Sequence, residues 1–322
     1  MYFNNTNKFF HGIMFHHFHD KGIHPKGQGS IDKDDFNKMI NFIGRNNILD
    51  ADVFFEKFKK NKLKDNEVCF TFDDAIKSQI DIALPILEDH KIKSFFFAYT
   101  SLFKGKPDNL EVFRYFRINY FKSINEFYDN FYKVLGKDLK FFFKKNNNKI
   151  KKTKIKFPTY SIEDIKFRLV RDIFLTKKEY EDLMFQMFEE KNFAYKDFYK
   201  ILFFQNDDLK QLDNLGHLIG LHSHNHPTLL EKLNYIEQKN EYVKCLSIIS
   251  DIIDKPKKEI KFMSHPCGSY NNDTLEILEE LGMELGFKQI MTIEPEKGMK
   301  KINNSFLEIA REDHAIIYKQ MN

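Results

Sequence analysis

The feature that most constrains the fold is the repetition of a short buried strand, a loop and a helix. The clearest unit starts with the apolar run Val68–Phe72, continues with an amphipathic helix over about 80–87 and returns to a strand at 94–98. A continuous apolar run is typical of a parallel strand that is buried on both faces. The sequence therefore predicts a βαβ unit here.

Similar units lie on both sides of this one. A strand is expected after residue 9, followed by a glycine- and proline-containing loop and by a helix that Ser30 would cap. Further strands are expected at 218–221, 260–263, about 285–292 and about 306–310, and further helices at about 232–253 and from 273. This alternation predicts an α/β protein with a parallel sheet, either open or closed into a barrel.

Residues from about 105 to 200 lose the alternation. They are rich in Phe, Lys, Tyr and Asp at helical spacing, with no clear strand. We interpret them as a helical insertion or cap in a single catalytic domain, 1–322. The lysines around 144–152 favour a solvated helix face or loop, and the role of the segment is left open between a lid, a dimer surface and a membrane-contacting patch.

Composition excludes several classes of protein. With 51 Lys+Arg against 47 Asp+Glu, the chain of 322 residues carries a net charge of only +4, which argues against a nucleic-acid partner. The three cysteines are scattered and form no CxxC pair, so a disulfide framework and a thiolate metal site are both excluded. Without a secretory start or a long apolar run, we expect a cytoplasmic protein with no transmembrane segment.

Polar clusters follow four of the predicted strands. Because the carboxyl ends of parallel strands meet at one edge of a sheet or barrel, these clusters should face a common cleft. The clusters are His16-His17-Phe18-His19, Thr71-Phe72-Asp73-Asp74, His222-Ser223-His224-Asn225-His226 and Ser264-His265-Pro266-Cys267-Gly268.

His222 and His226 are the strongest metal-site signal. Their spacing of four residues in a turn or short helix places both imidazoles on one side. Asp73 or Asp74 would supply a carboxylate. Two imidazoles and one carboxylate leave positions open for water and substrate, and they suit a divalent ion, Zn²⁺ first, with Co²⁺, Ni²⁺, Mn²⁺ or Fe²⁺ as alternatives.

Three of these motifs, in this order, resemble those of the polysaccharide deacetylase family, the NodB-homology domain. The resemblance covers residues 66–100 and 215–315 well, the segment around Met14–His17 moderately and the middle segment not at all. It implies a distorted (β/α) barrel and a metal-dependent hydrolase that removes an acetyl group from an N-acetylated sugar. The motifs are Thr71–Asp74, His222–His226 and Pro266–Tyr270.

The resemblance also implies roles for single residues. Asp73 would be the general base, and Asp74, His222 and His226 would hold the metal. The backbone N–H of Cys267 would bind the oxyanion. A thiol nucleophile at this position is disfavoured because no activating partner is evident.

One departure from the family pattern concerns the group that orients the base. The family often has an arginine just before the proline of the third motif, but this chain has Met263-Ser264-His265 there. We expect Arg311 to position Asp73 instead.

The acid that protonates the leaving amine has two candidates. His314, near the end of the last predicted strand, is favoured, with Asp313 or Glu312 beside it, and His16 is the alternative. His224 is expected to point away from the metal.

The sequence leaves three functions open. The first is a deacetylase of an N-acetylated sugar that is polymeric, lipid-linked or nucleotide-linked. The others are an amidase or deformylase of the same fold with a non-sugar or N-formyl substrate, and a catalytically silent sugar-binding scaffold. The oligomeric state is also left open.

Overall fold

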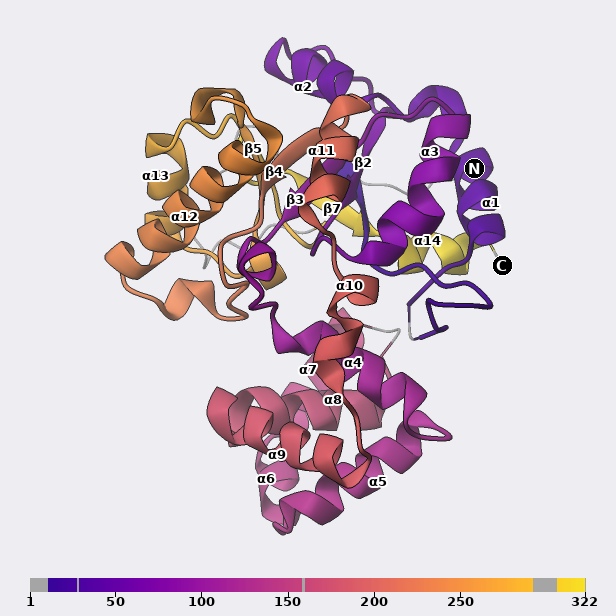
Figure 1. The fold of residues 1–322 in the computed structure, drawn as a ribbon, viewed down its shortest axis with the longest axis vertical. Coiled ribbons are helices and arrows are strands. Elements are labelled where there is room, and N and C mark those ends of the chain that lie inside the picture. The colour runs from indigo at the N-terminus through magenta and orange to yellow at the C-terminus, as the bar shows by residue number, and fades with distance from the viewer. Residues whose placement is uncertain (1–10, 28, 158–159, 292–305, 322) are drawn as a thin grey trace. The chain divides into compact units, whose positions relative to one another are not determined.

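The computed structural model describes residues 11–27, 29–157, 160–291 and 306–321 (Figure 1). It divides into two compact units. The barrel unit comprises Met1–Asp108 and Lys200–Asn322, and the helical unit comprises Asn109–Tyr199.

Seven parallel strands form the sheet of the barrel unit. Their order is β6-β5-β4-β3-β2-β1-β7, and a parallel bridge between Phe287 and Ile309 brings its two edges together. The sheet is therefore a nearly closed barrel, which confirms the predicted (β/α) barrel. The strands are β1 His11–Phe15, β2 Val68–Phe72, β3 Phe95–Ala98, β4 Leu218–Leu221, β5 Phe262–Ser264, β6 Leu285–Phe287 and β7 Ala310–Asp313.

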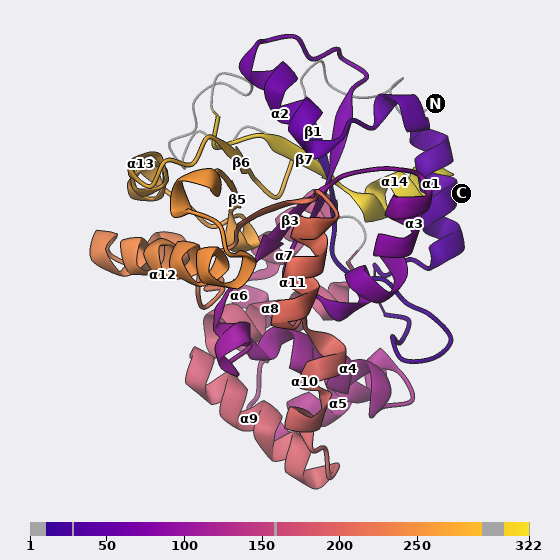
Figure 2. The same ribbon diagram turned by 45° about the horizontal axis from the view of Figure 1, so that its top comes forward.

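Helices surround this sheet, and Figure 2 shows it between α12 and α13 on one side and α1, α3 and α14 on the other. The helices of the barrel unit are α1 Lys33–Ile43, α2 Ala51–Lys59, α3 Leu84–Asp89, α11 Asn206–Asn214, α12 Tyr235–Ile253, α13 Asn272–Glu280 and α14 His314–Met321; α10 Tyr199–Leu202 begins at the unit boundary. The helices expected at 232–253 and from 273 correspond to α12 and α13. No pattern had indicated α2, α11 or α14.

The start of α1 corrects one prediction. Its N-cap is Asp32, whose carboxylate accepts hydrogen bonds from the N–H groups of Asp34 and Asp35. Ser30 instead accepts a hydrogen bond from the N–H of Gly27 and contacts His19 Nδ1 at 3.0 Å. Its hydroxyl is therefore used within the preceding loop.

An aromatic cluster fills the amino-terminal end of the barrel. Phe54 and Phe55 of α2 lie against Phe95, Phe262 and Phe287, with ring centroids 5.0–6.5 Å apart. These rings and their neighbours form one buried hydrophobic cluster. Because this end is closed by α2, the opposite, carboxyl-terminal end is the one that can carry a site.

Two expected strands have different bounds in the structure, one shorter and one displaced along the chain. The strand expected at about 285–292 ends at Phe287, and residue 292 lies outside the described residues. The strand expected at about 306–310 corresponds to β7, which begins only at Ala310. The extreme amino terminus, on which the expected compartment depended, also lies outside the described residues.

The helical unit is built on an aromatic core. Phe116 packs against Phe188 and Phe193, with centroids 4.6 and 5.3 Å away, and Phe131 packs against Phe167 at 5.0 Å. Its described residues contain no strand, and a role as a cap stays a prediction. The helices are α4 Asn109–Asn119, α5 Ile124–Leu135, α6 Lys140–Lys145, α7 Asn147–Lys156, α8 Ile162–Leu169 and α9 Lys177–Glu190.

None of the described helices combines the length and the apolar character that crossing a bilayer needs.

Candidate active site

The loops that follow β2, β4 and β5 carry an unusual backbone conformation. Nine described residues other than glycine have a positive φ, and five of them lie in these three loops. Such conformations are costly for residues with a Cβ and concentrate at functional sites. The five residues are Asp74, Ala75, Ser223, His226 and Cys267.

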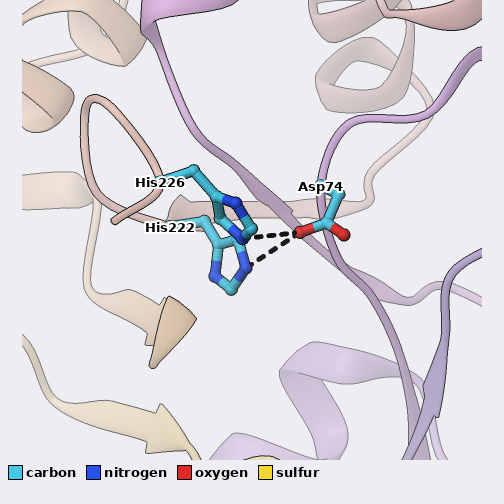
Figure 3. Close-up of side chains that lie close together, drawn as sticks. All are labelled: Asp74, His222 and His226. Carbon is cyan, nitrogen blue, oxygen red and sulfur yellow. Dashed lines mark ion pairs between the residues drawn. The ribbon is translucent and has the colours of Figure 1, made fainter. Parts of the chain in front are cut away.

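Three side chains from two of these loops converge on one point, as Figure 3 shows. Nε2 of His222 lies 3.1 Å from Oδ1 of Asp74, and Nε2 of His226 lies 3.2 Å from the same oxygen. Both imidazoles are nearly buried. The structure thus brings Asp74, rather than Asp73, together with both histidines.

The opposite nitrogens of both rings are held by oxygen atoms. Nδ1 of His222 lies 2.9 Å from the carbonyl oxygen of Ser264, and Nδ1 of His226 lies 3.0 Å from Oδ2 of Asp108. An N–H at each Nδ1 that donates to these oxygens leaves each Nε2 with its lone pair directed at Asp74. This tautomer is the one that binds a metal ion.

The cluster has the donors and the spacing that a divalent cation requires. Asp74, His222 and His226 each direct one ligand atom to a common region. Two ligand atoms about 2.1 Å from an ion are roughly 3.0–3.4 Å apart at right or tetrahedral angles, which fits the separations of 3.1 and 3.2 Å. Asp74 Oδ1 is also buried without a hydrogen-bond partner in the described part of the chain. The residues present therefore fit a bound dication.

The charges of these groups are strongly coupled. Burial raises the pKa of Asp74, but the His226 and His222 side chains outweigh burial and hold this pKa well below its usual value. Burial lowers the pKa of His226, while Asp74, Cys267 and Asp108 together raise it well above its usual value. A cation would compete with the proton that these acids favour on His226.

Asp73 lies beside the cluster in a different environment. Arg311 donates from Nη1 to Oδ1 at 2.8 Å and from Nη2 to Oδ2 at 2.6 Å, and Ser264 Oγ donates to Oδ2 at 3.1 Å. Both charged groups are buried. Burial raises the pKa of Asp73, but the charge of Arg311 contributes to a net lowering. Asp73 is therefore an ionised carboxylate that a bidentate guanidinium holds in place.

Arg311 itself is fixed from inside the barrel. Nε donates to the carbonyl oxygen of Lys288 at 2.8 Å, and Nη1 also donates to Thr71 at 3.1 Å. In β1, Gly12 leaves room for it, since a Cβ there would lie 3.3 Å from Thr71 and 3.4 Å from Arg311. The guanidinium has little freedom to leave Asp73.

The two candidate acids occupy different surroundings. His16 Nε2 lies 4.0 Å from Oδ2 of Asp73 and 3.8 Å from Oδ2 of Asp74, and its side chain is 22 % exposed. Gln79 connects the two loops by donating to the carbonyl oxygens of Asp73 and His16 at 2.6 and 2.9 Å. His16 thus faces both carboxylates and is open to solvent.

His314 is not brought into this cluster. Its Nδ1 lies 3.1 Å from the carbonyl oxygen of Met14, and its Nε2 lies 2.7 Å from that of Gly29. The ring is nearly buried and stacks on Phe15. Because both nitrogens already contact backbone acceptors, the sequence-based preference for His314 over His16 runs against the geometry.

The remaining expected residues lie at the edge of the site. Cys267 follows Pro266 in a short 3₁₀ turn, is exposed, and adds to the raised pKa of His226. The side chain of His224 is directed to Thr100, with Nδ1 2.9 Å from Oγ1, and not to the two histidines that flank it.

Sequence reasoning assigned no role to Asp108 and Ser264. Asp108 lies 118 positions from His226 in the chain, so no local spacing could reveal it. In the sequence, Ser264 is only one member of a polar cluster after a strand. Its carbonyl contact with His222 joins the ends of the neighbouring strands β4 and β5, whereas its hydroxyl contacts with Asp73 and Arg311 join strands that are not neighbours.

Comparison with known proteins decides the family. A family model described as Polysaccharide deacetylase matches residues 120–286, slightly more than half of the chain. This chain belongs to the polysaccharide deacetylase family. The match includes His222 and His226 but begins after Asp73 and Asp74, so the acidic pair is placed by the structure alone. A comparison with curated proteins found no match.

Solved structures support the deacetylase fold. The Streptococcus pyogenes deacetylase PplD in complex with acetate is 15 % identical with a TM-score of 0.55, over 96 % of this chain and 93 % of that one. A de-N-acetylase from Aggregatibacter actinomycetemcomitans is 13 % identical with a TM-score of 0.54, over 97 % and 99 %. IcaB from Ammonifex degensii is 12 % identical with a TM-score of 0.51, over 88 % and 85 %.

These similarities concern the fold. The family is named for the removal of acetyl groups from polysaccharides, which supports a hydrolase that acts on N-acetylated sugars.

Proposed function

We propose that this protein is a metal-dependent N-deacetylase of a sugar unit in a glycan or glycan precursor. One observation carries the proposal. The Nε2 atoms of His222 and His226 converge on Asp74 while Asp73, held by Arg311, stands beside them. Adjacent carboxylates in different environments suit different tasks, one as a metal ligand and one as a base.

Asp74, His222 and His226 would hold the divalent ion. When bound, this ion supplies Lewis acidity that lowers the pKa of water and polarises the amide carbonyl. The set of two imidazoles and one carboxylate fits Zn²⁺ and also admits Co²⁺, Ni²⁺, Mn²⁺ or Fe²⁺. His222 and His226 are nearly buried, and the low dielectric around them strengthens each electrostatic contact.

Asp73 is the general base in this proposal. It accepts a proton from the attacking water as the water oxygen forms a bond to the acetyl carbon. Arg311 and Ser264 donate hydrogen bonds to the carboxylate of Asp73, so that it stays ionised and correctly oriented until it takes the proton. The N–H of Cys267, in the turn beside His226, is the donor that we propose for the developing oxyanion.

His16 is the general acid that the geometry favours. Collapse of the tetrahedral intermediate breaks the C–N bond, and the departing amine takes a proton from His16 as acetate is released. Its Nε2 faces Asp73 and Asp74 at 4.0 and 3.8 Å, and its exposure gives a substrate access. His314, the acid favoured by sequence, has neither property.

The experiment measures metal content and acetate release from the same preparations. Wild-type protein should contain close to one divalent ion per chain and should release acetate from N-acetylglucosamine oligomers. Asp74→Ala and His222→Ala should lose the ion. Asp73→Asn should keep the ion and lose about 10²–10⁴-fold in kcat.

His224→Gln is the matched control, because this histidine lies between the two ligands but contacts Thr100. It should keep both the ion and activity. If the Asp73→Asn protein turned over as fast as wild type, the proposed mechanism would be wrong. Release of formate but not acetate from paired N-formyl and N-acetyl amino sugars would favour a deformylase, and metal binding without turnover of any amide would favour a silent scaffold.

A further inference from the structure

We propose that the outer face of α6 and α7 in the helical unit binds the surface of an anionic lipid bilayer. This basic face comprises Phe141, Lys144 and Lys145 of α6 and Lys151, Lys152 and Ile155 of α7. The proposal is independent of the proposed catalytic function, because none of these residues belongs to the candidate site.

Packing on one side of each helix defines the outer face. In α6, Phe142 and Phe143 pack inward, with Phe142 5.0 Å from Phe174 between ring centroids. In α7, Ile150 joins the same buried cluster. Residues three to four positions apart share a helix face. Phe141 therefore shares the opposite face of α6 with Lys144 and Lys145.

The same geometry applies to α7. Relative to buried Ile150, the positions of Lys152 and Ile155 lie on the far side of the helix, with Lys151 at its edge. Each outer face therefore carries one large apolar side chain and a pair of lysines.

The two apolar side chains on this face are the most exposed large hydrophobic side chains among the described residues. Ile155 is 81 % exposed and Phe141 is 79 % exposed, the two highest values among the large hydrophobic residues that the structure describes. Phe141 and Ile155 lie on the outer faces of consecutive helices, and exposed apolar side chains that are rimmed by charge indicate an interaction surface.

The charge around them is almost entirely positive and largely unpaired. Residues 137–156 contain nine lysines, one aspartate and no arginine. Six of these lysines form no ion pair with any residue in the part of the chain that the structure describes: Lys140, Lys144, Lys145, Lys149, Lys151 and Lys152. An anionic partner would neutralise them.

A bilayer fits this combination better than a nucleic acid does. Lysines around exposed aromatic and aliphatic side chains are typical of interfacial helices, whose apolar residues enter the headgroup boundary while the charges meet anionic lipids. Nucleic-acid contacts would leave Phe141 and Ile155 in water or beside phosphates. The arginines that commonly read phosphate and base edges are also missing from residues 137–156.

The experiment is co-sedimentation of the full-length protein with large vesicles. One set is pure phosphatidylcholine and the other contains 30 % phosphatidylglycerol. Wild-type protein should partition at least tenfold more strongly onto the anionic vesicles in low salt, and the difference should shrink at 0.5 M NaCl. Equal partition onto both sets, or none onto either, would overturn the proposal.

Two variants separate charge from apolar contact. Reversal of four lysines, with Lys144→Glu, Lys145→Glu, Lys151→Glu and Lys152→Glu, should reduce binding to anionic vesicles at least tenfold. Phe141→Ser with Ile155→Ser should weaken binding several-fold and make the remainder more sensitive to salt. Thermal unfolding monitors the fold of each variant.

Matched controls lie in the barrel unit. Lys257→Glu with Lys258→Glu removes two exposed lysines, and Ile236→Ser removes a side chain that is 71 % exposed; both proteins should bind as wild type does. If these controls lose as much binding as the test variants, only the net charge or hydrophobicity matters and the proposal fails.

Tighter binding to a DNA duplex than to anionic vesicles, if it survives Phe141→Ser, would also contradict the proposal. Acetate release from a soluble oligosaccharide should be unchanged in the variants, which distinguishes this test from that of the proposed function.

Discussion

Asp108 holds the ring of His226, with its Oδ2 3.0 Å from Nδ1 of that histidine. Asp108 is itself positioned, because its N–H donates to the hydroxyl of Tyr99 at 3.1 Å. A carboxylate on the far nitrogen of a metal-binding histidine fixes the tautomer and raises the basicity of the ligand nitrogen. The geometry therefore makes Asp108 a positioning residue for the metal site, although it would not touch the ion.

Replacement of Asp108 should weaken metal binding without abolishing it. We expect Asp108→Ala to lower zinc affinity by about 10–100-fold. Asp108→Asn keeps an acceptor oxygen, so its zinc affinity should lie between that of Asp108→Ala and that of wild type. Competition with a zinc-binding dye measures the effect. Asp81→Asn is the control, since Asp81 pairs with His24 at 2.8 Å in a different part of the barrel unit; an equal loss in this control would show that the effect is not specific to the site.

Arg311→Lys should impair catalysis more than metal binding. A lysine keeps the positive charge but cannot bind both oxygens of Asp73 as the guanidinium does. We expect kcat to fall by about tenfold or more. The hydrogen bonds of Arg311, besides its charge, lower the pKa of Asp73 against the effect of burial. Because a lysine keeps the charge but not the paired hydrogen bonds, the acid limb of the kcat/KM profile should move to higher pH. An unchanged acid limb would contradict this role.

His16 and His314 should respond differently to the same substitution. His16→Gln should keep the metal and the fold but lose about 10²–10³-fold in kcat, as expected for a general acid. His314→Gln should keep most activity but lose about 1–3 kcal/mol of unfolding free energy, because the carbonyls of Met14 and Gly29 would be poorly satisfied. Kinetics and urea unfolding of both variants test the pair. The reverse pattern would restore His314 as the acid.

These two histidines also show where sequence reasoning stops. His222, His226 and an aspartate, Asp73 or Asp74, could be predicted because they lie in loops that follow buried strands, and the ends of parallel strands meet. The choice of Asp74 as the ligand came from the family resemblance. His314 also follows a strand, β7, but it is the first residue of α14, and its ring lies between two backbone carbonyls. The direction of a side chain after the last residue of a strand depends on the next element, which had not been predicted.

Arg311 and Asp108 illustrate the same limit over longer distances. Arg311 could be suspected because the usual arginine was missing, and the structure then supplied its contacts. Asp108 had no such indication. Its contact with His226 connects the segment after β3 to the loop after β4, and hydrophobic periodicity says nothing about polar contacts between loops.

Glu312 should make stability depend on pH. Burial and then the neighbouring Asp313 raise its pKa from 4.5 to about 7. The folded state therefore holds the proton more tightly than the unfolded state, and the stability present below pH 4.5 is lost as the pH rises through 7. The shift corresponds to at most about 3 kcal/mol, and we expect roughly half because solvent screens a partly buried group.

Glu312→Gln removes this titration and provides the measurement. The variant and wild type should have similar unfolding free energies at pH 4.5, while at pH 8 the variant should be more stable by about 1–2 kcal/mol. Comparing the two proteins at each pH cancels the titration of all other groups. Urea unfolding at the two pH values therefore isolates this carboxyl. A variant that is less stable than wild type at pH 8 would show that ionised Glu312 has a favourable partner, because only such a partner offsets the cost of burying its charge.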